Sequence, residues 1–202
     1  ASRLAVDAII ESLEPEIADA SSGTTDADIR GKLDRAFRLA NERIVSRRSG
    51  DPRLEKMGTT LVVAWLSGNQ AHIAHIGDSR CYSLRGSQAL CLTRDDTVVQ
   101  NMLEDGSITR ADVPNVPFRN VLTRAVGTVE QAAPSYRRET LDEGDVLLLC
   151  SDGLTDSVPE YRWLEIHKES DGMERTVQAM IDAGLANEAG DNVSVVLLTL
   201  EY

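Results

Sequence analysis

Hydrophobic side chains recur at helical spacing along the first 50 residues. One apolar stripe in residues 2–14 and a second in residues 29–44 predict two helices that pack together on a sheet. Thr25 is the expected N-cap of the second helix, because two aspartates follow it where negative charge complements the helix dipole. A small polar connection over residues 20–25 joins the two helices, and the second one ends within residues 47–52.

From Gly58 onward the hydrophobic period changes from helical to strand-like. Turn residues at Gly68-Asn69 and at Arg85-Gly86-Ser87 separate short alternating segments. This pattern predicts an antiparallel meander. Its expected strands are residues 59–67, 71–76, 80–84 and 88–92.

The middle of the chain has a weaker pattern. Residues 95–106 predict a short helix with Asp95 or Asp96 as its cap, and residues 107–120 contain two prolines and no regular apolar spacing. We therefore expect an irregular excursion there, with strand or extended structure returning over residues 121–126.

The last third of the chain contains the strongest strand signal. Val146 to Cys150 are continuously apolar, which predicts a strand buried on both faces, preceded by a strand at residues 135–140. Two helices follow, and a long second buried strand is expected at residues 193–200. The expected helices are residues 159–168 and 173–186, the latter burying Val177, Met180, Ile181 and Leu185. Helices, then strands, then helices and a strand are typical of an α+β domain.

Composition narrows the classes of function. A formal net charge of -12 argues against a nucleic-acid partner, which needs a basic surface, and no apolar run is long enough to span a bilayer. The three cysteines, Cys81, Cys91 and Cys150, are widely spaced in apolar segments and indicate neither disulfides nor a zinc site. With no secretory signal pattern, the sequence favours a reducing cytoplasm.

Three acidic turns stand beside strand-like segments and carry Asp78, Asp152 and Asp191. If these strand ends lie side by side, the carboxylates repel one another, and divalent cations relieve the repulsion. Oxygen ligands without cysteine or histidine favour magnesium or manganese. An isolated Ser-Asp-Gly is more often a turn that caps a strand, so convergence is a hypothesis at this point. His72 and His75 have no metal-ligand spacing and are interpreted as packed or surface groups.

Five motifs together resemble the metal-dependent Ser/Thr protein phosphatases of the phosphatase 2C type, in their bacterial form. They occur in the order found in that family and cover nearly all of the chain from Gly58 onward. The motifs are Met-Gly-Thr-Thr at 57–60, His-Ile-Gly-Asp-Ser-Arg at 75–80, Arg-Asn-Val-Leu-Thr-Arg-Ala-Val-Gly at 119–127, Ser-Asp-Gly-Leu-Thr-Asp at 151–156 and Gly-Asp-Asn at 190–192.

The resemblance implies an α+β fold, a four-layer α-β-β-α sandwich of two antiparallel sheets flanked by helix pairs. It implies that Asp152 and Asp191 are catalytic residues that bind two Mn²⁺ or Mg²⁺ ions, and that Asp78 holds a third, weaker ion shared with Asp152. The reaction implied is hydrolysis of phosphoserine and phosphothreonine by a metal-activated water. The implied partners are phosphorylated proteins, including a cognate bacterial Ser/Thr kinase or its substrates, with a monomeric protein acting in the cytoplasm.

Residues 95–120 match the variable flap of this family, although the family's frequent Asp-His-Ser reads Asp95-Asp96-Thr97 here. A histidine role in the flap is therefore left open. Arg80 and Arg124 are interpreted as braces for the turns rather than phosphate ligands, and Cys150 as a core residue.

Two family motifs, Arg-x-x-Asn-Glu-Asp and Asp-Gly-x-Gly-Gly, are absent from residues 1–202. We therefore expect a single catalytic domain that lacks its N-terminal segment, with an incomplete ligand set. The alternative is a pseudophosphatase or regulatory module that keeps the fold and binds partners. A metal-dependent hydrolase of another substrate class is a third reading, which no motif supports.

Overall fold

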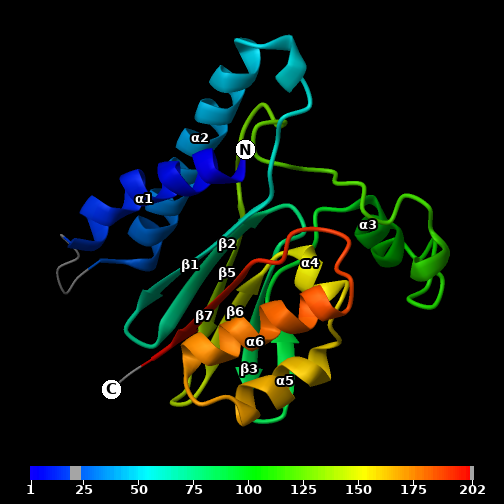
Figure 1. Ribbon diagram of the computed structural model, residues 1–202. Coiled ribbons are helices and arrows are strands. Elements are labelled where there is room, and N and C mark those ends of the chain that lie inside the picture. Colours follow the sequence, from blue (N-terminus) through cyan, green and yellow to red (C-terminus); the bar gives the residue numbers. More distant parts are fainter. Residues whose placement is uncertain (19–23, 201–202) are drawn as a thin grey trace. The chain divides into compact units, whose positions relative to one another are not determined.

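The computed structural model describes residues 1–18 and 24–200, which form an α+β arrangement of helices and two sheets (Figure 1). The chain divides into two compact units. The first unit consists of Ala1–Trp65, Ala74–Asp78 and Asp95–Tyr136, and the second of Leu66–Ile73, Ser79–Arg94 and Arg137–Tyr202.

Helices and strands alternate along the chain in blocks. The helices are α1 (Ser2–Ala18), α2 (Asp26–Ser49), α3 (Val98–Glu104), α4 (Asp152–Thr155), α5 (Glu160–Glu169) and α6 (Met173–Ala186), with short 3₁₀ turns η1 (Pro52–Leu54) and η2 (Val113–Asn115). The strands are β1 (Leu61–Ser67), β2 (Gln70–Ile76), β3 (Arg80–Arg85), β4 (Gln88–Cys91), β5 (Ser135–Thr140), β6 (Val146–Cys150) and β7 (Val195–Thr199). The predicted α+β class, with two antiparallel sheets flanked by helices, is confirmed.

The helix pair α1 and α2 forms as the apolar stripes predict. Thr25 caps α2 through a capping box, in which its hydroxyl accepts from the Asp28 amide at 3.2 Å and Asp28 accepts from the Thr25 amide at 3.0 Å. Both helices bury their stripes in one core with residues of β1 and β2 from the same unit. The helices contribute Ala5, Ala8, Leu13, Ile29, Leu33, Ala36, Phe37, Ala40 and Ile44 to this core. The predicted connection at residues 20–25 falls largely outside the described residues.

The sheet order corrects the predicted meander. The strands form two sheets, β1-β2-β5 and β4-β3-β6-β7, so β2 and β3 are not neighbours although they are consecutive. Gly77, with φ +103°, lies in the turn that separates them. The prediction was wrong at this connection because alternation along a strand identifies its faces but not its partner.

β6 is buried at all five positions, as its apolar sequence predicts, and pairs with β3 on one side and β7 on the other. Its side chains pack with Tyr82 of β3 against α5 and α6, where the Tyr82 and Trp163 rings meet edge to face at 5.0 Å. The bounds predicted for α5 and α6 hold to within a residue.

Two predictions about the C-terminal elements were wrong. β7 is not a buried strand: it ends its sheet, and Val196 is 52% exposed on the face opposite Val195 and Leu197. On α6, the predicted burial is confirmed for Met180, Val177 and Ile181 are half-buried, and Leu185 is 63% exposed. The fully buried row of α6 is Thr176, Met180 and Gly184, at a spacing of four, and a Cβ atom on Gly184 would lie 3.0 Å from the Val193 side chain.

The flap forms around α3. The predicted cap was wrong. Thr97 caps α3, and its hydroxyl accepts from the Gln100 amide at 3.1 Å, whereas the Asp96 carboxylate accepts from the Gly77 amide. Residues 107–120 are turns and a 3₁₀ segment, as the irregular pattern predicts. The segment at 121–126 is extended rather than a strand, with bridges from Leu122 to Thr97 and from Val126 to Thr59.

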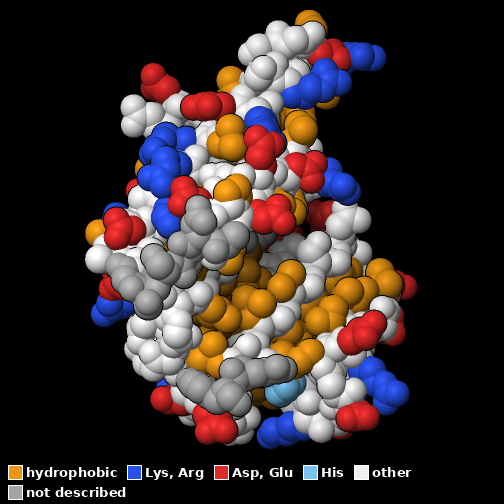
Figure 2. Space-filling view, turned by 90° about the vertical axis from the view of Figure 1, so that its left-hand side faces the viewer, with side chains coloured by type: hydrophobic (Ala, Val, Ile, Leu, Met, Phe, Trp, Pro, Cys, Tyr) orange, Lys and Arg blue, Asp and Glu red, His pale blue; other side chains and the backbone are white. Residues whose placement is uncertain are grey.

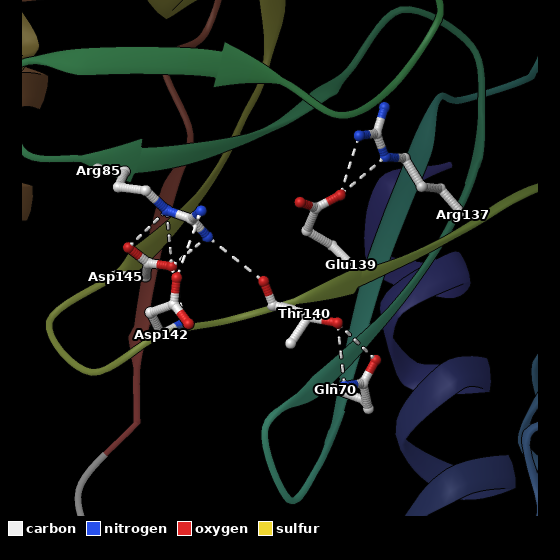
Figure 3. Close-up of polar contacts among 7 residues, drawn as sticks. All are labelled: Gln70, Arg85, Arg137, Glu139, Thr140, Asp142 and Asp145. Atoms are coloured by element: carbon white, nitrogen blue, oxygen red, sulfur yellow. Dashed lines mark hydrogen bonds and ion pairs between the residues drawn. The ribbon is translucent and has the colours of Figure 1, made fainter.

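An ion pair between the half-exposed Arg85 and the buried Asp145 joins the ends of β3 and β6 within the second unit (Figure 3). Arg85 donates to Asp145 from Nε at 3.0 Å and from Nη2 at 2.5 Å, and the Asp142 amide donates to the same carboxylate at 2.8 Å. Arg85 also donates to the Thr140 carbonyl at 3.3 Å. The hydrogen bond and charge of Asp145 raise the pKa of Arg85. This Arg85–Asp145 clasp sits at the end of β6 opposite to Asp152.

Asp145→Ala is expected to lower the free energy of unfolding by about 2 kcal/mol, because several charge-assisted hydrogen bonds are lost from a buried site. Glu139→Gln, which breaks the more exposed pair with Arg137 in Figure 3, should cost less than about 0.5 kcal/mol. Urea unfolding of both variants measures the difference. Equal losses would show that the clasp has no special role.

Candidate metal centre

The pairing of β6 with β7 brings two of the three acidic turns together. The last pair in the register joins Cys150 to Val195, so the segments that follow β6 and precede β7 lie beside each other. Three hydrogen bonds join these segments. They run from the Ser151 amide to the Ser194 carbonyl at 3.1 Å, from the Ser194 amide to Ser151 Oγ at 3.0 Å, and from Ser151 Oγ to the Asn192 carbonyl at 2.9 Å.

Gly153 allows the closest approach between the two turns. A Cβ atom at this position would lie 2.4 Å from the Asn192 carbonyl oxygen and 2.9 Å from its carbonyl carbon, so any side chain would push the backbones apart. The glycine of Ser-Asp-Gly is therefore required by packing across the two turns. The structure places Asp152 in the first turn of α4, with Ser151 at the N-cap position.

Burial raises the pKa of Asp152, and the negative charges of Asp191 and then Asp156 raise the pKa further. The Asp152 carboxylate accepts hydrogen bonds from the backbone amides of Asp152 and Gly153, which lower its pKa less than its other surroundings raise it. No basic side chain described in the second unit lies within ion-pair distance of Asp152. A divalent cation between Asp152 and Asp191 would remove this repulsion, and carboxylate oxygens are the donors that magnesium and manganese prefer.

Asp152 and Asp191 are thus brought together as the sequence predicts, and their carboxylates fit a hard cation. They do not make a complete ligand set: in residues 1–18 and 24–200, no group of three or more His, Cys, Asp or Glu side chains is placed to hold a metal ion. An incomplete ligand set within residues 1–202 stays a prediction.

Asp78 lies in the first unit, in the tight turn after β2, whereas Asp152 and Asp191 lie in the second. A Cβ atom on Gly77 would lie 2.4 Å from the Thr60 side chain, so this turn is packed directly on the Met-Gly-Thr-Thr motif. An ion shared by Asp78 and Asp152 remains a prediction.

Two of the three cysteines are unsuited to nucleophilic catalysis. Cys150 is 3% exposed, which confirms its interpretation as a core residue. Burial, with smaller contributions from neighbouring thiols, raises the pKa of Cys81 to about 12, so this thiol stays protonated at neutral pH.

Sequence reasoning missed the part played by Asp96. The sequence predicts Asp96 as a helix cap and shows it in place of the family's histidine, whereas in the structure its carboxylate is buried and accepts from the Gly77 amide at 2.9 Å. Arg124 donates to Asp96 and to the Ala133 carbonyl, which confirms that Arg124 braces the turns. The signal available in the sequence was the replacement of the family's histidine by Asp96.

The comparisons with known proteins agree on one family. The family model described as Protein phosphatase 2C matches residues 1–188. The chain is 37% identical over 170 residues to the serine/threonine protein phosphatase PstP of Mycobacterium tuberculosis, covering 84% of this chain and 33% of PstP. It is 34% identical over 174 residues to the serine/threonine phosphatase stp of Listeria monocytogenes, covering 86% of this chain and 69% of that protein. The chain thus spans a third of the length of PstP.

Solved structures support the fold. The crystal structure of PstP from Mycobacterium tuberculosis aligns with a TM-score of 0.86 at 34% identity, over 99% of this chain and 83% of that one. A structure of the PstP catalytic domain in complex with two manganese ions aligns with a TM-score of 0.81 at 33% identity, over 96% and 80% of the two chains.

Gly153→Ala is expected to lower the free energy of unfolding by about 2 kcal/mol and to weaken Mn²⁺ binding, because it forces the two acidic turns apart. Gly190→Ala is the matched control, since open space surrounds Gly190 and its change should stay within about 0.5 kcal/mol. Urea unfolding and calorimetric Mn²⁺ titration measure both effects. Normal Mn²⁺ binding by Gly153→Ala would contradict the prediction that metal binding depends on the close approach of the two turns.

Asp152→Asn is expected to stabilise the metal-free protein at pH 7. The raised pKa means that the folded state disfavours the Asp152 charge, so stability contributed by this group increases as pH falls through its folded pKa towards the ordinary value of 3.8. The variant should lose that pH dependence. Urea unfolding with a chelator at pH 7 and pH 5 tests this, with the exposed Asp171→Asn as control. A less stable Asp152→Asn at pH 7 would contradict the prediction.

Proposed function

Because the chain belongs to the protein phosphatase 2C family, we propose that it hydrolyses phosphoserine and phosphothreonine in proteins with Mn²⁺ or Mg²⁺ as cofactor. The observation that carries this proposal is the meeting of Asp152 and Asp191 at paired strand ends, with a raised pKa at Asp152. The named relatives are serine/threonine phosphatases, and the PstP catalytic domain was crystallised with two manganese ions.

Asp152 and Asp191 are the residues proposed to hold the catalytic ions, with Asp78 at a third, weaker position. Bound divalent ions would supply an acidified water as nucleophile and positive charge for the phosphoryl oxygens. Burial desolvates Asp152, and the hydrogen bonds of Ser151 and the close packing of Gly153 fix the turn around it. The chain needs no nucleophile of its own, in keeping with the buried Cys150 and the protonated Cys81.

We propose further that residues 1–202 form the larger part of one catalytic domain and that the two-metal centre uses ligands beyond those they contain. Two close divalent ions need more oxygen donors than a pair of aspartates offers. The chain also covers about four fifths of the solved catalytic domain to which it is similar.

The proposed substrates are phosphorylated proteins, including a cognate Ser/Thr kinase or that kinase's substrates. A nucleic-acid partner is disfavoured by the net charge of -12, and basic side chains are interspersed with acidic ones on the face in Figure 2. Within the described residues, no helix combines the length and apolar character that crossing a membrane requires. We propose a monomer that acts in the cytoplasm.

The test is phosphate release from a phosphothreonine peptide by the complete natural chain, with Mn²⁺ and with a chelator. Release should require the metal, and Asp152→Asn and Asp191→Asn should each lower turnover roughly 100-fold or more, since each removes a proposed ligand. Asp171→Asn, an exposed aspartate, should retain normal activity.

Near-normal turnover in both ligand variants would overturn the metal mechanism. Peptide binding without any phosphate release by the complete chain would favour the regulatory-module alternative. Residues 1–202 alone should release little phosphate, and a rate equal to that of the complete chain would contradict the proposal of additional ligands.

A further inference from the structure

Asp96 is a buried carboxylate that the proposed catalytic reaction does not use. It is 4% exposed, and its Oδ2 accepts from the Gly77 amide at 2.9 Å. The bond is reciprocated through the backbone, because the Asp96 amide donates to the Gly77 carbonyl at 3.0 Å. Asp96 therefore holds both polar groups of the residue directly before Asp78.

The same residue sits where the flap begins and where its chain returns. Thr97, the next residue, caps α3, and the amide of Thr123 donates to the Asp96 carbonyl at 2.8 Å. A second pair, from the Val98 amide to the Val121 carbonyl at 2.9 Å, closes the base of the flap one residue further on. The flap is thus a loop whose two ends are joined at Asp96.

Arg124 extends this connection. Its Nη1 lies 3.4 Å from Asp96 Oδ1 and 3.4 Å from the Ser135 hydroxyl, and Nη2 donates to the Ala133 carbonyl. Asp96 is almost completely buried and Arg124 is only about one-third exposed, so the pair is partly shielded from solvent screening. The return of the flap is therefore anchored through both the backbone and the side chain of Asp96.

The turn that receives these bonds has little freedom to adjust. Gly77 has a positive φ that disfavours other residues, and it is packed on Thr60. A displacement of Asp96 would consequently move the turn as a unit and shift Asp78 with it.

We propose that Asp96 is a positioning residue that ties both ends of the flap to the turn carrying Asp78. This inference rests on the proposed function, because it takes Asp78 as the ligand of the weaker ion. Its consequence is a reciprocal coupling: an ion bound by Asp78 orders the flap, and a flap ordered by substrate strengthens binding of that ion.

The Arg85–Asp145 clasp provides a matched control. Asp145 is also a buried aspartate paired with an arginine, but it lies at the far end of β6 in the second unit and has no bond to the flap. Asp96→Asn and Asp145→Asn therefore make the same chemical change in two similar environments. A purely structural role for Asp96 predicts that the two variants behave alike.

The experiment uses the complete natural chain and trypsin, which should cut the flap at the exposed Arg110 and Arg119. In the unaltered protein, Mn²⁺ at millimolar concentration should slow these cuts. Asp96→Asn should be protected less at that Mn²⁺ concentration, and its Mn²⁺ concentration for half-maximal protection should rise about tenfold, because a charge-assisted bond to the turn is weakened. Asp145→Asn should keep both properties even where its unfolding midpoint falls equally.

Arg124→Gln serves as a second variant if Asp96→Asn does not fold. It keeps the bond to Gly77 but releases the return of the flap, so cleavage should accelerate while protection by Mn²⁺ is reduced. The proposal is overturned if Mn²⁺ gives no protection in the unaltered protein, if Asp96→Asn matches Asp145→Asn, or if Arg124→Gln leaves cleavage unchanged. None of these measurements needs turnover. Coupling without phosphate release would contradict the proposed function and support this inference.

Discussion

The antiparallel pairing of β6 with β7 is the constraint on which the candidate centre depends. It sets two aspartate-bearing turns beside each other, and the carboxylates then repel across a partly desolvated gap. The apolar packing of β6 against α5 and α6 and the bonds made by Ser151 hold the turns in place against this repulsion. If these strand ends served only stability, replacing Asp152 or Asp191 with a neutral residue would stabilise the protein, because the repulsion would be lost.

The residues of the sequence motifs contact one another in two separate sets. In the first unit, Gly77 packs on Thr60, and Thr59 exchanges hydrogen bonds with Val126, so motifs far apart in the chain support one turn. In the second unit, Gly153 meets Asn192 across the two acidic turns. Most of the motif residues therefore shape the turns, and only a few carboxylates are left to meet a cation.

Sequence reasoning succeeded where a local pattern determines the structure. The stripe and cap of α2, the fully apolar β6 and the bounds of α6 follow from periodicity and end signals within one segment. It failed where the outcome depends on a distant partner. Alternation could not show that β2 and β3 separate into different sheets, nor that β7 ends its sheet with Val196 exposed. The pairing of Asp152 with Asp191 was implied by family resemblance, whereas the bond of Asp96 to Gly77 joins residues 19 positions apart and has no local signature.

Three aspartates in this chain show how the surroundings of a carboxylate distinguish a scaffold from a site. Asp145 and Asp96 are buried more deeply than Asp152, yet each faces an arginine and backbone amides, so their charges are compensated within the protein. Asp152 also accepts from backbone amides, but it faces Asp191 and Asp156 in place of an arginine, and burial together with these charges raises its pKa. Burial alone therefore does not mark the site; the lack of an internal cation within the described second unit does. A carboxylate pair left uncompensated by its own fold is poised to take its positive charge from a metal ion.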